Sequence, residues 1–181
     1  MTKKLVLFGD SLLGRCNKEL IMQLERKLDG KYDVYNCAAG GWDTNDGLKK
    51  CFYIATLKAD LVIISFGTND AAPWKKVELQ KFETNIKNML EVFKKGKVIF
   101  FLPPPVDEKK QQNEIKRVNE TVKKYYDTGK QVCIKKDVEY IDSWLVFLPM
   151  LEKGYDYYVN DGVHINEAGY NKLFESIKEL V

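Results

Sequence analysis

KLVLFGDSL, residues 4–12, is the stretch of sequence that decides the fold. Its first half, Lys4 to Phe8, shows no alternation of polar and apolar positions after the lysine and ends at a glycine. Such a run is typical of a strand that is buried on both faces of a parallel sheet. Similar runs occur at Leu61 to Phe66 and Val98 to Leu102, and weaker ones at Tyr32 to Tyr35 and Val138 to Ile141. The sequence therefore predicts five strands.

Amphipathic segments with helical spacing lie between these strands and after the last one. Their apolar positions are Leu20, Leu24 and Leu28; Phe82, Ile86, Met89, Leu90 and Phe93; Ile115, Val118, Val122 and Tyr125; and Tyr170, Leu173, Phe174, Ile177 and Leu180. Strands that alternate with helices imply right-handed crossovers and a parallel sheet covered on both sides. We expect an α/β fold, a three-layer α/β/α sandwich with a five-stranded parallel sheet. No repeat or linker interrupts the chain, so residues 1–181 are expected to form a single domain.

The composition is that of an ordinary globular protein. The 181 residues include 29 basic and 26 acidic side chains, a net charge of +3 with histidine neutral, and 45% are hydrophobic. Lysine pairs are spread along the whole chain, so no nucleic-acid-binding surface is expected. No apolar run approaches the roughly 18 residues that span a bilayer, and no membrane association is expected.

The cysteines and the N-terminal segment predict a cellular location. Cys16, Cys37, Cys51 and Cys133 form no C-x-x-C pair, and the apolar run from Leu5 to Phe8 is too short for the core of a signal peptide. We expect reduced thiols and a cytoplasmic protein.

A single histidine, His164, limits the chemistry that this chain can perform. Zinc hydrolases and two-metal phosphoesterases usually take two or more imidazole ligands. The glycine motifs of dinucleotide and nucleotide sites are also missing from the sequence. We therefore expect no metal and no cofactor, and any catalysis by histidine must use His164.

Three segments that follow strands have unusual sequences at the edge where open α/β sheets bind ligands. Ser11, after Gly-Asp, either caps the next helix or presents its hydroxyl and backbone N–H at this edge. A glycine pair ending at Gly41 permits close approach to a ligand, although an ordinary loop explains it nearly as well. Asn69 either forms a turn or cap, or offers an amide donor next to Ser11. Asp10 and Asp70 are interpreted as turn and cap residues.

The segment NDGVHIN, residues 160–166, precedes the C-terminal helix. A lone histidine is often a surface or capping residue. Here Asp161 stands three positions before His164, with a glycine between them, and can accept a hydrogen bond from one imidazole nitrogen. The other nitrogen would then face Ser11. The sequence thus provides candidates for a nucleophile, a base, an orienting carboxylate and oxyanion donors.

Taken together, these blocks resemble those of the SGNH hydrolase superfamily, also called the GDSL esterases and lipases. The blocks are Gly-Asp-Ser-Leu at 9–12, the glycine block that ends at Gly41, Gly-Thr-Asn-Asp at 67–70 and Asp-Gly-Val-His at 161–164. They occur in the order of the family, and the resemblance extends from Leu5 to Val181. Segments 41–44, 69–72 and 103–108 are most similar to the isoamyl acetate-hydrolysing esterase branch. The resemblance implies the SGNH hydrolase fold, with the flavodoxin-like strand order 2-1-3-4-5.

The resemblance also implies a role for each matching residue. Ser11 would be the nucleophile and His164 its general base, with Asp161 orienting the imidazole. The backbone N–H groups of Ser11 and Gly41 and the side-chain amide of Asn69 would form the oxyanion hole. Such a set suits the chemistry, because a serine hydroxyl attacks an ester poorly without a base and the oxyanion needs preorganised donors.

The implied function is that of a serine esterase acting on small carboxylic esters through an acyl-enzyme on Ser11. Little chain is left for a lid, so we expect an open, shallow cleft that accepts short acyl groups, acetylated sugars and thioesters being candidate substrates. Trp42, Trp74 and Pro104, which lies in the run Pro103–Pro105, are candidate walls of this cleft.

Burial in the core is the alternative for each aromatic residue, and we expect it for Trp144 and Phe147. Two other functions stay open: an O-acyltransferase that uses the same triad on a sugar hydroxyl, and a non-catalytic α/β binding module. The expected partner is a small-molecule ester. The sequence indicates no oligomeric state.

Overall fold

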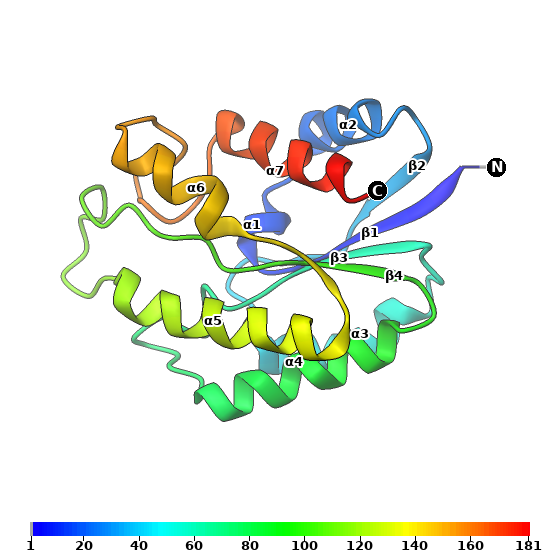
Figure 1. Ribbon diagram of the computed structural model, residues 1–181, viewed down its shortest axis with the longest axis horizontal. Helices are drawn as coiled ribbons and strands as arrows, with labels where there is room; N and C mark the ends of the chain where they lie inside the picture. The colour runs from blue at the N-terminus through cyan, green and yellow to red at the C-terminus, as the bar shows by residue number, and fades with distance from the viewer. Residues whose placement is uncertain (1) are drawn as a thin grey trace.

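The apolar runs form one parallel sheet in the computed structural model, which describes residues 2–181 (Figure 1). Its order is β2-β1-β3-β4-β5, and every pair of neighbours is parallel. This result confirms the predicted α/β fold and strand order, and each strand end lies within one residue of its expected position. The strands are β1 (Lys3–Gly9), β2 (Tyr32–Asn36), β3 (Leu61–Ser65), β4 (Lys97–Phe101) and β5 (Glu139–Ile141).

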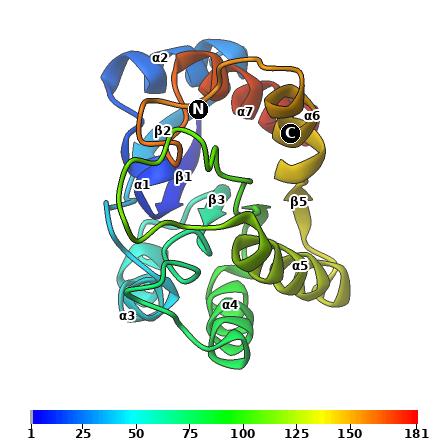
Figure 2. The same ribbon diagram turned by 90° about the vertical axis from the view of Figure 1, so that its left-hand side faces the viewer.

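Helices cover both faces of the sheet, as Figures 1 and 2 show. One face carries α1 (Ser11–Gly14), α2 (Lys18–Lys27), α6 (Ser143–Glu152) and α7 (Glu167–Glu179), and the other carries α3 (Thr44–Ala55), α4 (Leu79–Phe93) and α5 (Asn119–Lys136).

Alternation along β1 divides the core into two halves. Leu5 and Leu7 pack with the helices of the first face, whereas Val6 and Phe8 pack with those of the second. All four side chains are fully buried, because the central strand is covered from both sides. The sheet is thus a rigid base for the loops at its edges.

Three helices, α1, α3 and α6, are not among those predicted from the apolar spacing. Helix α3 begins with a capping box, in which Asp43 accepts hydrogen bonds from the backbone N–H of Asn45 and Asp46 while the Asp46 carboxylate accepts from the Asp43 N–H. In α6, Phe147 is fully buried as expected, but Trp144 is only half-buried and donates to the Pro103 carbonyl at 3.2 Å.

The predicted start of α5 is wrong. The spacing placed Ile115 and Val118 in this helix, but Ile115 is 61% exposed and Val118 has extended backbone angles just before the helix begins. The cause is Gln111, whose side chain donates to the Arg117 carbonyl at 2.8 Å and accepts from the Arg117 N–H at 2.9 Å. Since these backbone groups are already paired, residues 102–118 form a long loop after β4.

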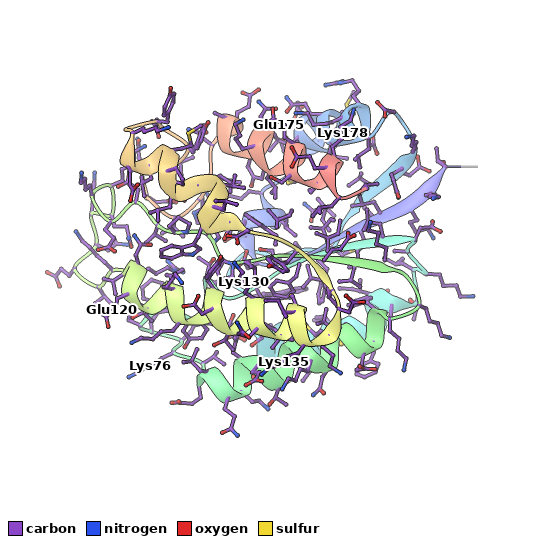
Figure 3. The ribbon with its side chains drawn as sticks, in the orientation of Figure 1. Lys76, Glu120, Lys130, Lys135, Glu175 and Lys178 are labelled. Carbon is purple, nitrogen blue, oxygen red and sulfur yellow. The ribbon has the colours of Figure 1, made fainter. Side chains whose placement is uncertain are left out.

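Charged side chains cover the outside of the helical layers. Figure 3 shows Glu175 and Lys178 on α7 and Lys135 on α5, all of which are exposed. None of the helices in residues 2–181 combines the length and the apolar character needed to cross a membrane.

Candidate active site

The loops after the strands gather at the carboxyl edge of the sheet. Ser11 lies two residues after the end of β1, Gly41 follows β2 and Asn69 follows β3. His164 comes from the segment between α6 and α7 and reaches this edge, where it lines a cleft together with the other three. The fold thereby unites residues that are up to 153 positions apart in the sequence.

Ser11 is the first residue of the short helix α1. Asp10 caps this helix, its carboxylate accepting from the Leu12 N–H at 2.9 Å. The Tyr170 hydroxyl donates to the Leu12 carbonyl at 2.8 Å and so ties the turn to α7. As the first helical residue, Ser11 carries an N–H that has no acceptor within its own helix. The turn therefore offers both a hydroxyl and a backbone donor to the cleft.

Ser11, His164 and Asp161 form a continuous hydrogen-bonded chain. The Ser11 Oγ lies 2.7 Å from His164 Nε2, and His164 Nδ1 lies 2.6 Å from Asp161 Oδ2. The other carboxylate oxygen accepts from the backbone N–H groups of Val163 and His164, each at 2.9 Å. With Asp161 ionised, Nδ1 carries the proton and Nε2 is free to accept the serine proton. The arrangement is that of a nucleophile, a base and an orienting carboxylate.

The electrostatics of this chain favour a neutral His164 imidazole. Burial lowers the pKa of His164 below its usual 6.5, and the charges of Arg15 and Arg117 lower it further, against the opposing effect of Asp161. Burial would raise the pKa of Asp161, but the hydrogen bonds from His164 and Val163 outweigh it and the pKa is lowered. Both shifts favour a neutral imidazole beside an ionised carboxylate, which is the state that general-base catalysis requires.

Two further donors line the cleft beside Ser11. Gly41 has a positive φ of 78°, and among residues 2–181 its N–H has no backbone or side-chain acceptor. The Asn69 amide donates to the Trp42 carbonyl at 2.9 Å, which uses only one of its two N–H bonds. The structure thus brings Ser11, Gly41 and Asn69 to one cleft, where they can stabilise an oxyanion.

The cleft has a volume of about 420 Å³. It is lined by Ser11, Gly14, Arg15, Gly40, Gly41, Asn69, Trp74, Arg117 and His164. Of the three suggested walls, Trp74 lies in the cleft, whereas Trp42 and Pro104 do not line it. The Trp42 ring packs edge-on against Phe8 in the core, and Pro104 is buried.

Arg15 and Arg117 are the charged residues of the cleft that the sequence did not indicate. Arg15 lies 3.8 Å from Asp161, with both side chains partly exposed. Arg117 stacks on the Trp74 ring, 4.6 Å from its centre, and donates to Asn69 Oδ1 at 2.8 Å. Neither residue belongs to a recognisable motif. The proline run Pro103–Pro105, at the start of the loop that carries Arg117, was the signal that marked this loop.

Two buried carboxyls, Asp10 and Asp70, lie near Ser11 in the cap and turn positions predicted for them. Burial raises the pKa of Asp10 to about 7 and that of Asp70 to about 6. Asp70 accepts hydrogen bonds from the backbone and hydroxyl of Thr44 and from the Gly67 N–H, which join the loops after β2 and β3. Residues 2–181 contain no group of three His, Cys, Asp or Glu side chains placed to hold a metal ion.

Comparison with known proteins gives one family. The model of the GDSL-like Lipase/Acylhydrolase family matches residues 7–172. A curated relative, the GDSL esterase/lipase WDL1 of Oryza sativa subsp. japonica, is 26% identical over 165 residues, covering 78% of this chain. The match spans 62% of the length of WDL1, so the rice protein is considerably longer than the matched region.

Solved structures share the fold over nearly the whole chain. A lipase/acylhydrolase from Enterococcus faecalis superposes with a TM-score of 0.89 at 25% identity, covering 99% of this chain and 95% of the other. The acetylxylan esterase Axe2 of Geobacillus stearothermophilus has a TM-score of 0.79 at 20% identity and covers 98% and 93%.

Proposed function

Because the chain belongs to the GDSL-like lipase/acylhydrolase family, we propose that it is a serine hydrolase of small carboxylic esters. The observation that carries this proposal is the unbroken chain from the Ser11 hydroxyl through His164 to Asp161, with contacts of 2.7 and 2.6 Å. Family membership and the likeness to the Enterococcus faecalis lipase/acylhydrolase support the same chemistry.

In the proposed mechanism, Ser11 Oγ attacks the ester carbonyl carbon while His164 Nε2 takes the hydroxyl proton. The negative charge that develops on the carbonyl oxygen is met by the N–H groups of Ser11, Gly41 and Asn69. The tetrahedral intermediate then collapses, and the imidazolium returns the proton to the departing alcohol. Water, deprotonated by His164, attacks the acyl-enzyme; the bond to Ser11 Oγ breaks, the imidazolium returns the proton to this oxygen, and the carboxylic acid is released.

The cleft supports a preference for short acyl groups. Trp74 is the one large apolar side chain among the residues that line it, and the rest are glycines or polar residues. A long acyl chain needs apolar surface to bury its methylene groups, each worth about 0.8 kcal/mol when buried. Acetyl and butyryl esters, including acetylated sugars, are therefore the proposed substrates. The finer likeness to isoamyl acetate-hydrolysing esterases stays a prediction from three sequence segments.

The proposal is tested by hydrolysis of p-nitrophenyl acetate, butyrate and octanoate, with wild type beside Ser11→Ala. We expect activity on the two short esters, slow turnover of octanoate, and a drop of roughly 10⁶-fold in kcat for the variant. Lack of activity on all three esters, with both proteins folded, would contradict the proposal. Acetyl transfer to an added sugar in place of hydrolysis would indicate an acyltransferase with the same triad.

A further inference from the structure

We propose that Arg117 is a positioning residue, which holds the Asn69 amide in the orientation that an oxyanion donor needs. The proposal rests on the proposed ester hydrolysis and adds a component that lies in the loop after β4. It would explain why a 17-residue loop, 102–118, extends to the cleft.

The amide of Asn69 is held from both ends. Its Oδ1 accepts from Arg117 Nη2 at 2.8 Å, and its Nδ2 donates to the Trp42 carbonyl at 2.9 Å. A rotation of the amide by half a turn would place an NH₂ group against the guanidinium and an oxygen against a carbonyl, so both hydrogen bonds would be lost. The contacts therefore select a single orientation, which leaves the second N–H of Asn69 available in the cleft.

The Arg117 side chain is itself fixed by groups from other loops. Its Nε donates to the Thr68 carbonyl at 3.0 Å, and Trp74 stacks on the guanidinium. The guanidinium thus makes two hydrogen bonds to neighbouring residues, from Nε to the backbone carbonyl of Thr68 and from Nη2 to the side chain of Asn69. A planar guanidinium with several donors in a rigid fork can make such a pair of bonds, which the single ammonium of a lysine cannot reproduce in the same geometry.

The Arg117 backbone is also fixed. Gln111, only 7% exposed, pairs with both the N–H and the carbonyl of Arg117. An arginine that served only to make the surface soluble would require neither this pairing nor the stacking on Trp74. The contacts instead connect the buried Gln111, through Arg117, to Asn69, the proposed oxyanion donor.

A double-mutant cycle separates positioning from a direct effect of the charge. Asn69→Ala is expected to lower kcat by about 10²–10³, and Arg117→Gln by up to about 10², the usual cost of a misplaced catalytic group. If Arg117 acts through Asn69, the double variant loses no more than Asn69→Ala alone, and KM changes little throughout. Losses that multiply would overturn the proposal, because Arg117 would then act independently of Asn69.

The matched control is Arg26→Gln, which removes the same charge from an exposed position on α2 and should keep wild-type kcat. Arg117→Lys serves as a second variant that keeps the charge and the aliphatic stem, should Arg117→Gln fail to fold. We expect it to lose kcat as well, because it lacks the fork. Wild-type kcat in Arg117→Lys would overturn the proposal.

A second measurement does not depend on ester hydrolysis. Heteronuclear relaxation of the ¹⁵N side-chain amide of Asn69 should show an ordered group in wild type and Arg26→Gln, and a mobile one in Arg117→Gln. An equally ordered amide in all three proteins would overturn the proposal. If wild type hydrolyses no ester, the proposed function fails, and this measurement alone decides the role of Arg117.

Discussion

Replacing Gly162 by alanine should strain the backbone and, in addition, displace the turn that carries Asp161 and His164. Gly162 has a φ of +70°, and its carbonyl accepts a hydrogen bond from the Asp107 N–H at 2.7 Å. A Cβ at this position would lie 2.2 Å from the Asp107 carbonyl oxygen, whereas ordinary contact begins at 3.4 Å. The turn and the loop after β4 must therefore separate by roughly 1 Å in the tightly packed molecule.

The expected loss of activity follows from what these two segments carry. The turn holds Asp161 and His164, and the loop carries Arg117 to Asn69. A displacement of about 1 Å can cost roughly 10²-fold in rate. We expect kcat/KM for p-nitrophenyl acetate to fall by about this factor in Gly162→Ala.

Gly154→Ala is the matched control. Gly154 has a φ of +78°, but a Cβ there would have no heavy atom within 4 Å. Both variants should lose about 1–2 kcal/mol of stability from the left-handed conformation, measured by urea unfolding. Only Gly162→Ala should lose additional stability and activity. Equal stability and activity in the two variants would refute the reasoning.

Two further predictions concern protonation. Because His164 must be neutral to act as a base and burial lowers its pKa, kcat/KM should fall with decreasing pH at a midpoint below 6.5; a midpoint at or above 6.5 would contradict this. The raised pKa of Asp10, about 7, favours folding at low pH, and this contribution is lost as the pH rises from about 4 through 7. Between pH 5 and pH 8, the free energy of unfolding in urea should therefore fall by about 3 kcal/mol more for wild type than for Asp10→Asn. Parallel plots of this free energy against pH would show that the Asp10 carboxyl does not titrate as described.

The sheet could be predicted from sequence because its signal is local. The central strands β1, β3 and β4 are covered on both faces, so they appear as continuous apolar runs. Helix α3 had local signals as well, in the pair Asp43 and Asp46 three positions apart and in the apolar positions Leu48, Cys51 and Ala55 that follow at helical spacing.

The start of α5 and the role of Arg117 could not be predicted, because both depend on contacts between distant segments. Apolar residues at helical spacing do not form a helix when a side chain such as Gln111 has already paired with the backbone groups. Arg117 acquires its environment from Thr68 and Trp74, which lie more than 40 positions earlier in the chain.

The candidate site was predicted in part. Ser11, Asp161 and His164, which the matched motifs singled out, form a hydrogen-bonded chain, since each motif fixes its own turn and the strand order brings the turns together. Substrate walls have no such motif. Trp42 follows Gly41 in sequence, yet its ring packs edge-on against Phe8 and is partly buried against the core.

The most direct test of the central claim is the reaction of the protein with a fluorophosphonate, followed by peptide mass spectrometry. The reagent captures a serine only where a base activates it and the oxyanion is stabilised. We predict a single adduct on Ser11, which disappears in Ser11→Ala and forms far more slowly in His164→Ala. No adduct on the folded wild-type protein, or an adduct on another residue, would contradict the account.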